Sequence, residues 1–161
     1  MEPVDALYQG IKPLQFDVPD YVKCMRFPDI TTRFVAILGH DHRYRGMVAS
    51  PYQTRCVQQG EIHELIYVYQ NKDGSIDLNH AWYLGFIEFK QGCVLAKGMT
   101  MDIAGGHTGT LIAFDMTHAP NHLNILIATD TPQTGVTAGL NIADQCMFRM
   151  PSLVQGTAQT S

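Results

Sequence analysis

The chain has 161 residues, of which 45% are hydrophobic and 16% charged, whereas a soluble domain carries about 25% charged residues. The net charge of -4 argues against nucleic acid and anionic membranes as main partners. This length allows one domain to bury a hydrophobic core without disulfides or structural metals.

The cysteines and the N-terminus bear on the compartment. The four cysteines, Cys24, Cys56, Cys93 and Cys146, are widely spaced and form no CxxC pair, so we expect reduced thiols and no structural zinc site. The N-terminus lacks the basic and apolar regions of a secretory signal. The longest apolar runs have five residues, whereas a transmembrane helix needs about 20. These features predict a cytoplasmic protein that does not cross a membrane.

The chain divides into three predicted parts. Residues 1–20 contain prolines and acidic side chains without periodicity, which predicts an irregular N-terminal arm. Residues 21–150 carry recurring period-two apolar patterns and predict one β-barrel domain. Residues 151–161 are mostly small and polar and predict a flexible tail.

The predicted strands follow one another at short intervals. The segment 33–39 (RFVAILG) is β-branched and apolar on both faces, which favours a buried strand. Residues 62–69 and 78–89 flank the turn residues Asn71-Lys-Asp-Gly-Ser75, which predict a hairpin. Further strands are expected over residues 92–102, 109–118, 122–130 and 136–150.

These strands indicate the fold class. Short connections and apolar residues on both faces favour an all-β fold, a single-domain antiparallel β-barrel of about eight or nine strands. A two-sheet β-sandwich is the alternative. Strands that are apolar on both faces also predict a covered exterior, and therefore a homo-oligomer.

The first hairpin supplies one row of candidate residues. If Gln70 and Ser75 close the loop, Tyr67 lies opposite Leu78, and His63 lies opposite Trp82. One face then carries Glu61, His63, Tyr67, His80, Trp82 and Phe86. Apolar walls with a few convergent polar groups suit a small-molecule pocket. A slip of one residue would remove this row.

The second hairpin supplies a histidine pair. If residues 119–121 form a three-residue loop, His118 lies opposite His122, and Phe114 lies opposite Leu126. The pair would stand at the end of an otherwise apolar row, as at the mouth of a barrel. A surface pair beside a turn is the alternative.

Two histidines separated by one residue follow the first buried strand. On an extended backbone His40 and His42 point the same way and offer two metal ligands. A third ligand would come from Glu61, His63 or His118. Arg43 and Arg45 stand beside them, and guanidinium groups recognise carboxylate or phosphate by paired hydrogen bonds. An anionic substrate group is therefore expected near this segment. The alternative is that the segment is a solvated loop without a function.

A glycine-rich segment between two predicted strands holds Asp102 and His107. The carboxylate could fix the tautomer of the imidazole and make it a general base, although plain turn chemistry explains the same pattern. The chain has no P-loop, no Rossmann glycine pattern and no G-x-S-x-G elbow. Hydride transfer and serine acyl transfer are therefore not expected.

The residues together predict a small-molecule enzyme with a histidine-lined barrel pocket. Its chemistry would be acid/base or metal-assisted, of the isomerase, cyclase, lyase or hydratase type, on a partly apolar, anionic substrate. We assign catalysis to His40, His42, His63, His80, Asp102 and His107, substrate binding to Arg43, Arg45, Tyr67, Trp82, Phe86, Phe114, His118 and His122, and metal ligation to His40, His42 and Glu61. The cofactor is unknown. The residues allow for a divalent metal, either iron, zinc or manganese, and iron would imply a dioxygenase. No nicotinamide or flavin motif is present.

Two other function classes fit the same sequence. A non-catalytic, lipocalin-like binding protein would use Tyr67, Trp82, Phe86 and Phe114 for an apolar ligand. An accessory subunit would pair its apolar outer faces with a larger enzyme.

Overall fold

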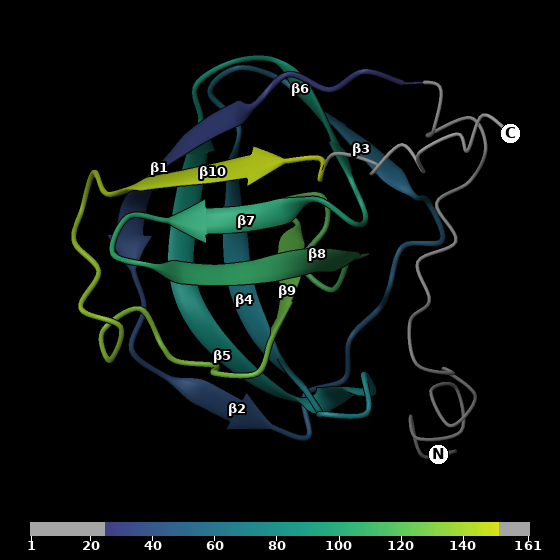
Figure 1. The fold of residues 1–161 in the computed structure, drawn as a ribbon, viewed down its shortest axis with the longest axis vertical. Coiled ribbons are helices and arrows are strands. Elements are labelled where there is room, and N and C mark those ends of the chain that lie inside the picture. Colours follow the sequence, from purple (N-terminus) through teal and green to yellow (C-terminus); the bar gives the residue numbers. More distant parts are fainter. Residues whose placement is uncertain (1–24, 152–161) are drawn as a thin grey trace, which may run out of the picture.

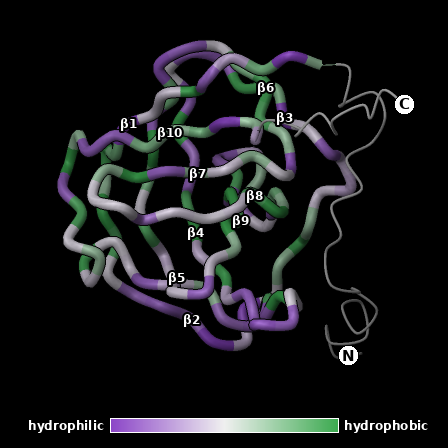
Figure 2. The backbone as a smooth tube through the Cα atoms, in the orientation of Figure 1, coloured by the Kyte–Doolittle hydropathy of each residue, from purple (hydrophilic) through white to green (hydrophobic). Residues whose placement is uncertain are grey.

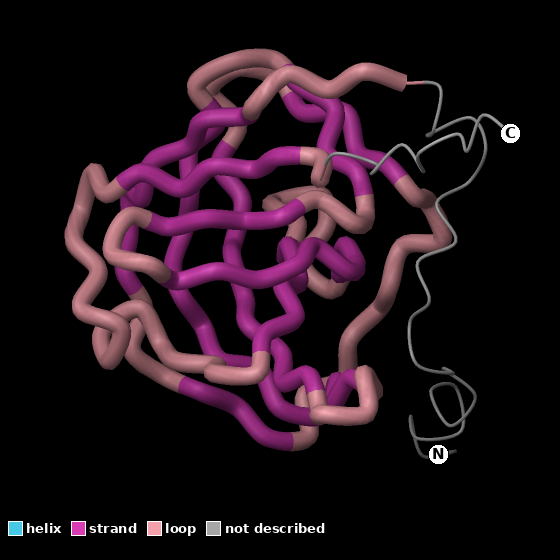
Figure 3. The backbone as a smooth tube through the Cα atoms, in the orientation of Figure 1, coloured by secondary structure: helices cyan, strands magenta, loops and turns pink. Residues whose placement is uncertain are grey.

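The computed structural model describes residues 25–151, which form strands and loops without a helix (Figure 3). The strands are β1 (Ile30–Ile37), β2 (Asp41–Arg43), β3 (Thr54–Val57), β4 (Ile62–Gln70), β5 (Ile76–Phe89), β6 (Cys93–Ala96), β7 (Thr100–Ile103), β8 (His107–Asp115), β9 (Asn124–Thr129) and β10 (Gln145–Arg149). No helix in this part of the chain is long and apolar enough to cross a membrane. The predicted arm and, beyond Pro151, the predicted tail lie outside the described residues.

Seven of these strands close into a barrel (Figure 1). They are hydrogen-bonded in the order β1-β10-β7-β8-β9-β4-β5, and β5 pairs with β1 to complete the circle. The short strand β2 extends the sheet along β5 beyond β1, and β3 pairs with β6 in a separate sheet. The predicted all-β barrel is confirmed, in preference to the sandwich.

The barrel sheet is mixed, whereas the sequence predicted an antiparallel one. β4 and β9 run parallel, and the other pairs are antiparallel. The prediction assumed that strands pair with their neighbours in sequence. Instead, the β8–β9 hairpin returns to the free edge of β4, so that β9 starts at the same end of the barrel as β4.

The hairpin of β4 and β5 forms with another register. Irregularities on β5 place Tyr67 opposite Trp82 and His63 opposite Ile87, so the predicted partners of Tyr67 and His63 are wrong. A bulge adds a residue that has no partner on the other strand, so counting outward from the turn gives the wrong pairs beyond it. Gly85 marks one of these irregularities, with a φ of 156°.

The loop between β8 and β9 is longer than predicted. It spans residues 116–123, and Phe114 lies opposite Ile125, so the predicted partner of Phe114 is wrong by one residue. His118 and His122 still lie side by side, because the loop folds back and the N–H of His122 donates to the carbonyl of His118 at 3.4 Å.

Two predicted strands are shorter than expected. The segment 92–102 divides at Gly98 into β6 and β7, and within 136–150 only β10 is a strand. Residues before β10 fill a gap along β1, where the N–H of Ala143 donates to the carbonyl of Phe34.

Alternation divides the apolar side chains between two cores. The larger core fills the barrel interior and includes Leu65, Tyr67, Leu111, Phe114, Ile125 and Ile127. The smaller core lies on the outer face of the wall and includes Ile66, Val68, Tyr83, Ile112 and Leu126. The barrel strands are accordingly rich in hydrophobic residues, whereas β2 is hydrophilic (Figure 2). Met47, from the segment after β2, packs on the outer core, so the chain itself covers part of the face from which a homo-oligomer was predicted.

Gly85 allows a close approach of β1 to β5, and we expect Gly85→Ala to lower the free energy of unfolding by about 3 kcal/mol. A Cβ at this position would lie 2.1 Å from the carbonyl oxygen of Ala36, which is backbone and cannot turn aside. Chemical denaturation measures the loss. Gly46→Ala is the matched control, because no atom lies within 4 Å of its Cβ. Equal effects of the two substitutions would contradict this reading of the bulge.

Candidate functional site

The candidate site lies on the outer face of the barrel, where β4 and β9 begin and β8 ends. Glu64 of β4 is beside Asn124 of β9, which is opposite Asp115 of β8. All three side chains are buried. Alternation places Glu64 on the same face as Ile66 of the outer core. The polar groups therefore meet outside the wall, whereas the sequence predicted a histidine pair at an interior mouth.

Both oxygens of Asp115 accept hydrogen bonds. Its Oδ1 accepts from the N–H of Val48 at 2.7 Å and from the N–H and hydroxyl of Thr117. Its Oδ2 accepts from Nδ2 of Asn124 at 2.7 Å and Nη1 of Arg45 at 2.8 Å. Burial alone would raise the pKa of Asp115, but the hydrogen bonds outweigh it and lower that pKa. The ionised carboxylate thus fixes Arg45 in place.

Arg45 connects this carboxylate to His118. Its Nη2 lies 3.0 Å from Nε2 of His118, and its guanidinium lies 5.7 Å from the ring centroid of Tyr83. Because arginine only donates, Nε2 of His118 is the acceptor and carries no proton. A neutral imidazole has one lone pair, so metal ligation by His118 would replace this hydrogen bond.

Glu64, His118 and His122 form a group that could hold a metal ion, their ligand atoms all lying within 4.8 Å of one another. The rings of His118 and His122 stack with centroids 5.1 Å apart. Nε2 of His122 lies 3.4 Å from Oε2 of Glu64, is buried, and has no hydrogen-bond partner among residues 25–151. A buried polar atom without a partner lowers the free energy of unfolding by about 1–3 kcal/mol, so a further group bound beside this nitrogen would stabilise the fold.

The spacing fits a divalent cation. Nitrogen and oxygen ligands lie about 2.1 Å from zinc, so two ligands at a tetrahedral angle are about 3.4 Å apart. This matches the distance between His122 and Glu64. Two histidines and one carboxylate leave coordination positions open, as in catalytic zinc and non-haem iron sites.

The tautomer of His122 depends on Asn121. Nδ2 of Asn121 lies 2.8 Å from Nδ1 of His122, so in this arrangement Nδ1 accepts and the proton lies on Nε2, which faces Glu64. The two orientations of an amide are interchangeable by rotation. Metal ligation by Nε2 requires the other orientation, in which the amide oxygen accepts from Nδ1–H and Nε2 keeps its lone pair.

His63 lies at the same end of β4, on the inner side of the wall. Its Nδ1 accepts from the N–H of Leu123 at 3.0 Å, so the proton sits on Nε2, 3.3 Å from Oε1 of Glu61. The N–H of Gln58 also donates to Glu61. Burial lowers the pKa of His63, although Glu61 opposes this effect. A neutral imidazole and a backbone amide therefore hold the carboxylate of Glu61.

The lowered pKa of His63 predicts a loss of stability in weak acid. The unfolded chain takes up this proton near pH 6.5, whereas the folded imidazole resists protonation. The free energy of unfolding should therefore fall as the pH drops below 6.5 toward the folded pKa, by at most about 1.4 kcal/mol per pH unit from this group. Urea denaturation at several pH values should show a shallower dependence for His63→Gln than for the wild type. Parallel curves for the two proteins would contradict the assignment.

Two adjoining cavities open beside these groups. One of about 340 Å³ is lined by Arg55, Glu61, Ile62, His63, Met116, Ala119, Pro120, Asn121, His122 and Leu123. The other, of about 300 Å³, is lined by Ser50, Tyr52, Thr54, Arg55, Cys56, Phe114, Met116 and Leu123. Their shared residues show that the two spaces adjoin. The first brings Glu61, His63 and His122 to one space.

Three of the predicted catalytic histidines lie elsewhere. His80 is seven residues before Ile87, the partner of His63, which separates the two histidines by roughly 20 Å along β5. His40 and His42 are exposed. The structure therefore does not gather these three around His63: the predicted register was wrong for His80, and β2 pairs with β5 near Trp82, away from His63.

Two further predicted site residues, Arg43 and Trp82, are neighbours of His80. His80 lies opposite Arg43, its Nε2 contacts Asp41 at 2.6 Å, and its ring stacks on Trp82 at 3.6 Å. Hydrogen bonding by His80 lowers the pKa of Asp41. These contacts join β2 to β5. His40 instead stacks at 4.2 Å on Tyr83, the ring below Arg45.

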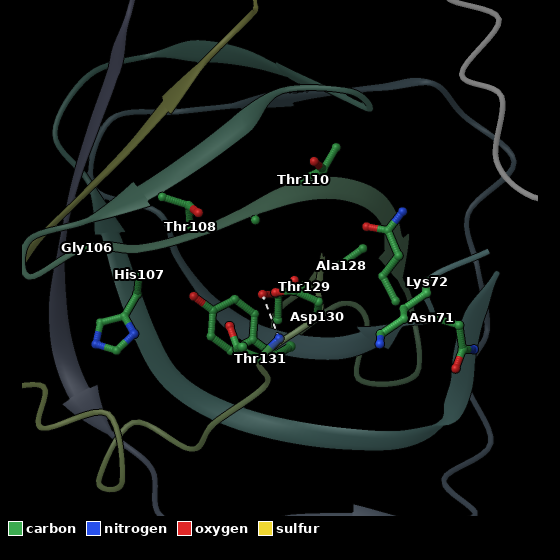
Figure 4. A pocket seen from close by; sticks show the side chains of 13 residues that line it. Asn71, Lys72, Gly106, His107, Thr108, Thr110, Ala128, Thr129, Asp130 and Thr131 are labelled. Atoms are coloured by element: carbon green, nitrogen blue, oxygen red, sulfur yellow. Dashed lines mark hydrogen bonds between the residues drawn. The ribbon is translucent and has the colours of Figure 1, made fainter. Parts of the chain in front are cut away.

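Asp102 and His107 do not form the predicted pair. Asp102 lies opposite Thr108, one register position away from His107, so the two side chains point to opposite faces. The charged partner of Asp102 is Arg149, at 3.9 Å. His107 instead lines a third cavity, of about 440 Å³, with Asn71 and Lys72 on its other side (Figure 4).

The predicted aromatic residues are divided among these places. Tyr67 lines the third cavity, and burial raises its pKa. Phe86 meets the ring of His122 edge-on at 5.1 Å. Phe114 is buried in the barrel core and lines the 300 Å³ cavity. Phe86 and Phe114 thus adjoin the candidate site, whereas Tyr67 and Trp82 do not.

Sequence reasoning missed Glu64, Asp115 and Arg55 as site residues. Glu64 stands within an apolar strand, where an unpaired charge is costly, and that signal alone could have singled it out. Asp115 carried the same signal, and its partner is Arg45. Arg55 belongs to the arginine-rich stretch 26–55, but no local pattern singles it out, because β3 reaches the site only through the fold.

The comparisons with known proteins give the family. Residues 25–149 match the model of a family of unknown function (DUF6917). The chain belongs to this family. No curated protein and no solved structure matches the chain at a significant level. The match covers the barrel and every residue of the candidate site.

Proposed function

We propose that this member of the family is a small-molecule enzyme that uses a divalent metal ion bound by Glu64, His118 and His122. The observation that carries the proposal is the buried Nε2 of His122, which faces Glu64 at the spacing of two ligands and lacks a hydrogen-bond partner among the described residues. A bound ion would polarise an oxygen of the substrate.

Glu61 is the candidate general base of this centre. Its carboxylate lines the cavity that His122 also lines. The Nε2–H of His63 and the N–H of Gln58 hold it from two sides, so His63 is a positioning residue in this proposal. A carboxylate held beside a metal-polarised substrate can remove a proton, which supports isomerase, lyase or hydratase chemistry on a partly apolar, anionic substrate.

Metal analysis tests the proposal. Titration of the metal-stripped chain with Zn²⁺, Mn²⁺ and Fe²⁺ in a calorimeter should show one ion per chain with micromolar or tighter affinity for at least one of them. His122→Ala should abolish this binding, and His42→Ala, an exposed histidine outside the cluster, should not. Failure of all three ions to bind with this stoichiometry would overturn the proposal.

The compartment and the assembly belong to the same proposal. Cys56, Cys93 and Cys146 are free thiols, which supports a cytoplasmic protein. Burial raises the pKa of Cys93 to about 11 and that of Cys146 to about 12, so neither is a reactive thiolate. The homo-oligomer stays a prediction, and the small-molecule partner is the substrate described above.

A further inference from the structure

The two cavities that share Arg55, Met116 and Leu123 differ in chemistry. The cavity on the His122 side presents ionisable groups, Glu61 and His63. The cavity on the other side includes the apolar side chains of Phe114, Met116 and Leu123, with Tyr52 and Cys56 at its edge. A ligand that occupies both must therefore have a polar end and an apolar end.

Arg55 stands at the junction of the two cavities. It is exposed on β3, and its guanidinium makes no hydrogen bond or ion pair with any of residues 25–151. Arg45, by contrast, already forms an ion pair with Asp115. Arg55 is the cation at this site that is available to an anion.

We propose that the double cavity binds a carboxylic acid with an apolar chain. Arg55 receives the carboxylate by paired hydrogen bonds, which suits the planar guanidinium. The chain fills the space beside Phe114, Met116 and Leu123. A sugar would leave hydroxyl groups against these apolar walls, and a phosphate dianion would place a second negative charge near Glu61, where a carboxylate places one.

This assignment deepens the proposed function and, as a statement about its substrate, rests on it. The carbon next to the carboxylate would lie on the side of Glu61 and His122. A C–H bond beside a metal-polarised carboxylate can lose its proton to Glu61, which takes up that proton while the electron pair stays on the substrate. Binding of the acid itself requires no metal and can be measured separately.

Calorimetry with three probes tests the assignment. Octanoate carries both features, octanamide only the apolar chain, and acetate only the carboxylate. We expect octanoate to bind the wild type at least about tenfold more tightly than the other two. Arg55→Gln should weaken octanoate by about tenfold or more and leave octanamide unchanged. Equal affinities of octanoate and octanamide, or no effect of Arg55→Gln, would overturn the assignment.

Matched controls separate this assignment from the metal proposal. Arg43→Gln removes another exposed arginine, on β2, and should leave octanoate binding unchanged. Metal titration of Arg55→Gln should match the wild type, because Arg55 is not a ligand. Metal binding without octanoate binding would overturn only the carboxylate assignment. Octanoate binding without metal binding would overturn only the proposed function.

Discussion

Glu64→Gln is expected to weaken metal binding by more than about 100-fold while leaving the metal-free chain as stable as the wild type or slightly more stable. Glu64 is the anionic member of the ligand group, and glutamine keeps its size while removing its charge. The carboxylate is buried beside the imidazole of His122, 3.4 Å away, and accepts no hydrogen bond from residues 25–151, so its charge is costly in the absence of a cation. The substitution should relieve that cost.

Two measurements check this prediction. Calorimetric titration gives the metal affinity, and thermal unfolding in a chelator gives the stability of the metal-free chain. Glu88→Gln is the matched control, since Glu88 pairs with Arg33 on a neighbouring strand. It should lower stability slightly and leave metal affinity unchanged. A large fall in the melting temperature of Glu64→Gln, with unchanged metal affinity, would assign Glu64 a purely structural role.

The barrel could be predicted from the sequence because its signals are local. The turn residues from Asn71 to Ser75 produce the hairpin, and there Asp73 accepts from Ser75 and Asn71 donates to Ser75. Period-two alternation predicted the strands and their two faces. A strand such as β4 is apolar on both faces: Leu65 lies in the interior core and Ile66 in the outer core, with the sheet between them.

The register could not be predicted, because it depends on tertiary contacts. The bulge at Gly85 exists where the backbone of β1 approaches β5, which no local pattern records. That shift, together with the larger one between Val68 and Tyr69, moved His63 away from His80 and ended the predicted row. The parallel pairing of β4 with β9 brings Glu64 beside Asn124, and it likewise results from the way in which distant segments meet.

The site could be predicted only in part for the same reason. His118 was expected beside His122, and the two rings do stack, although within the longer loop 116–123 and not across a three-residue turn. Arg45 was expected at an anionic group, and the anion it meets is Asp115 of the chain itself. Glu64 joins the two histidines only when β9 has been placed beside β4.

Asp115→Asn is expected to destabilise the fold by about 3–5 kcal/mol, because it removes one partner of a buried ion pair. Asp115 is fully buried, and both of its oxygens accept hydrogen bonds. An asparagine turned either way would point an NH₂ group at donors, at Val48 and Thr117 or at Arg45 and Asn124. Thr117→Val removes a single donor and should cost about 1 kcal/mol.

The destabilisation caused by Asp115→Asn should extend to the candidate site. The side chain of Asp115 ties down Arg45 and Val48, and between them Met47 covers the outer core. Without this tie, hydrogen exchange at residues 45–50 should accelerate before the barrel strands open. Urea denaturation and exchange of Asp115→Asn measure the two effects. Wild-type stability of Asp115→Asn would contradict this prediction. It would show that residues 45–50 stay in place without the carboxylate, and that the ion pair with Asp115 is not what orients Arg45 toward His118.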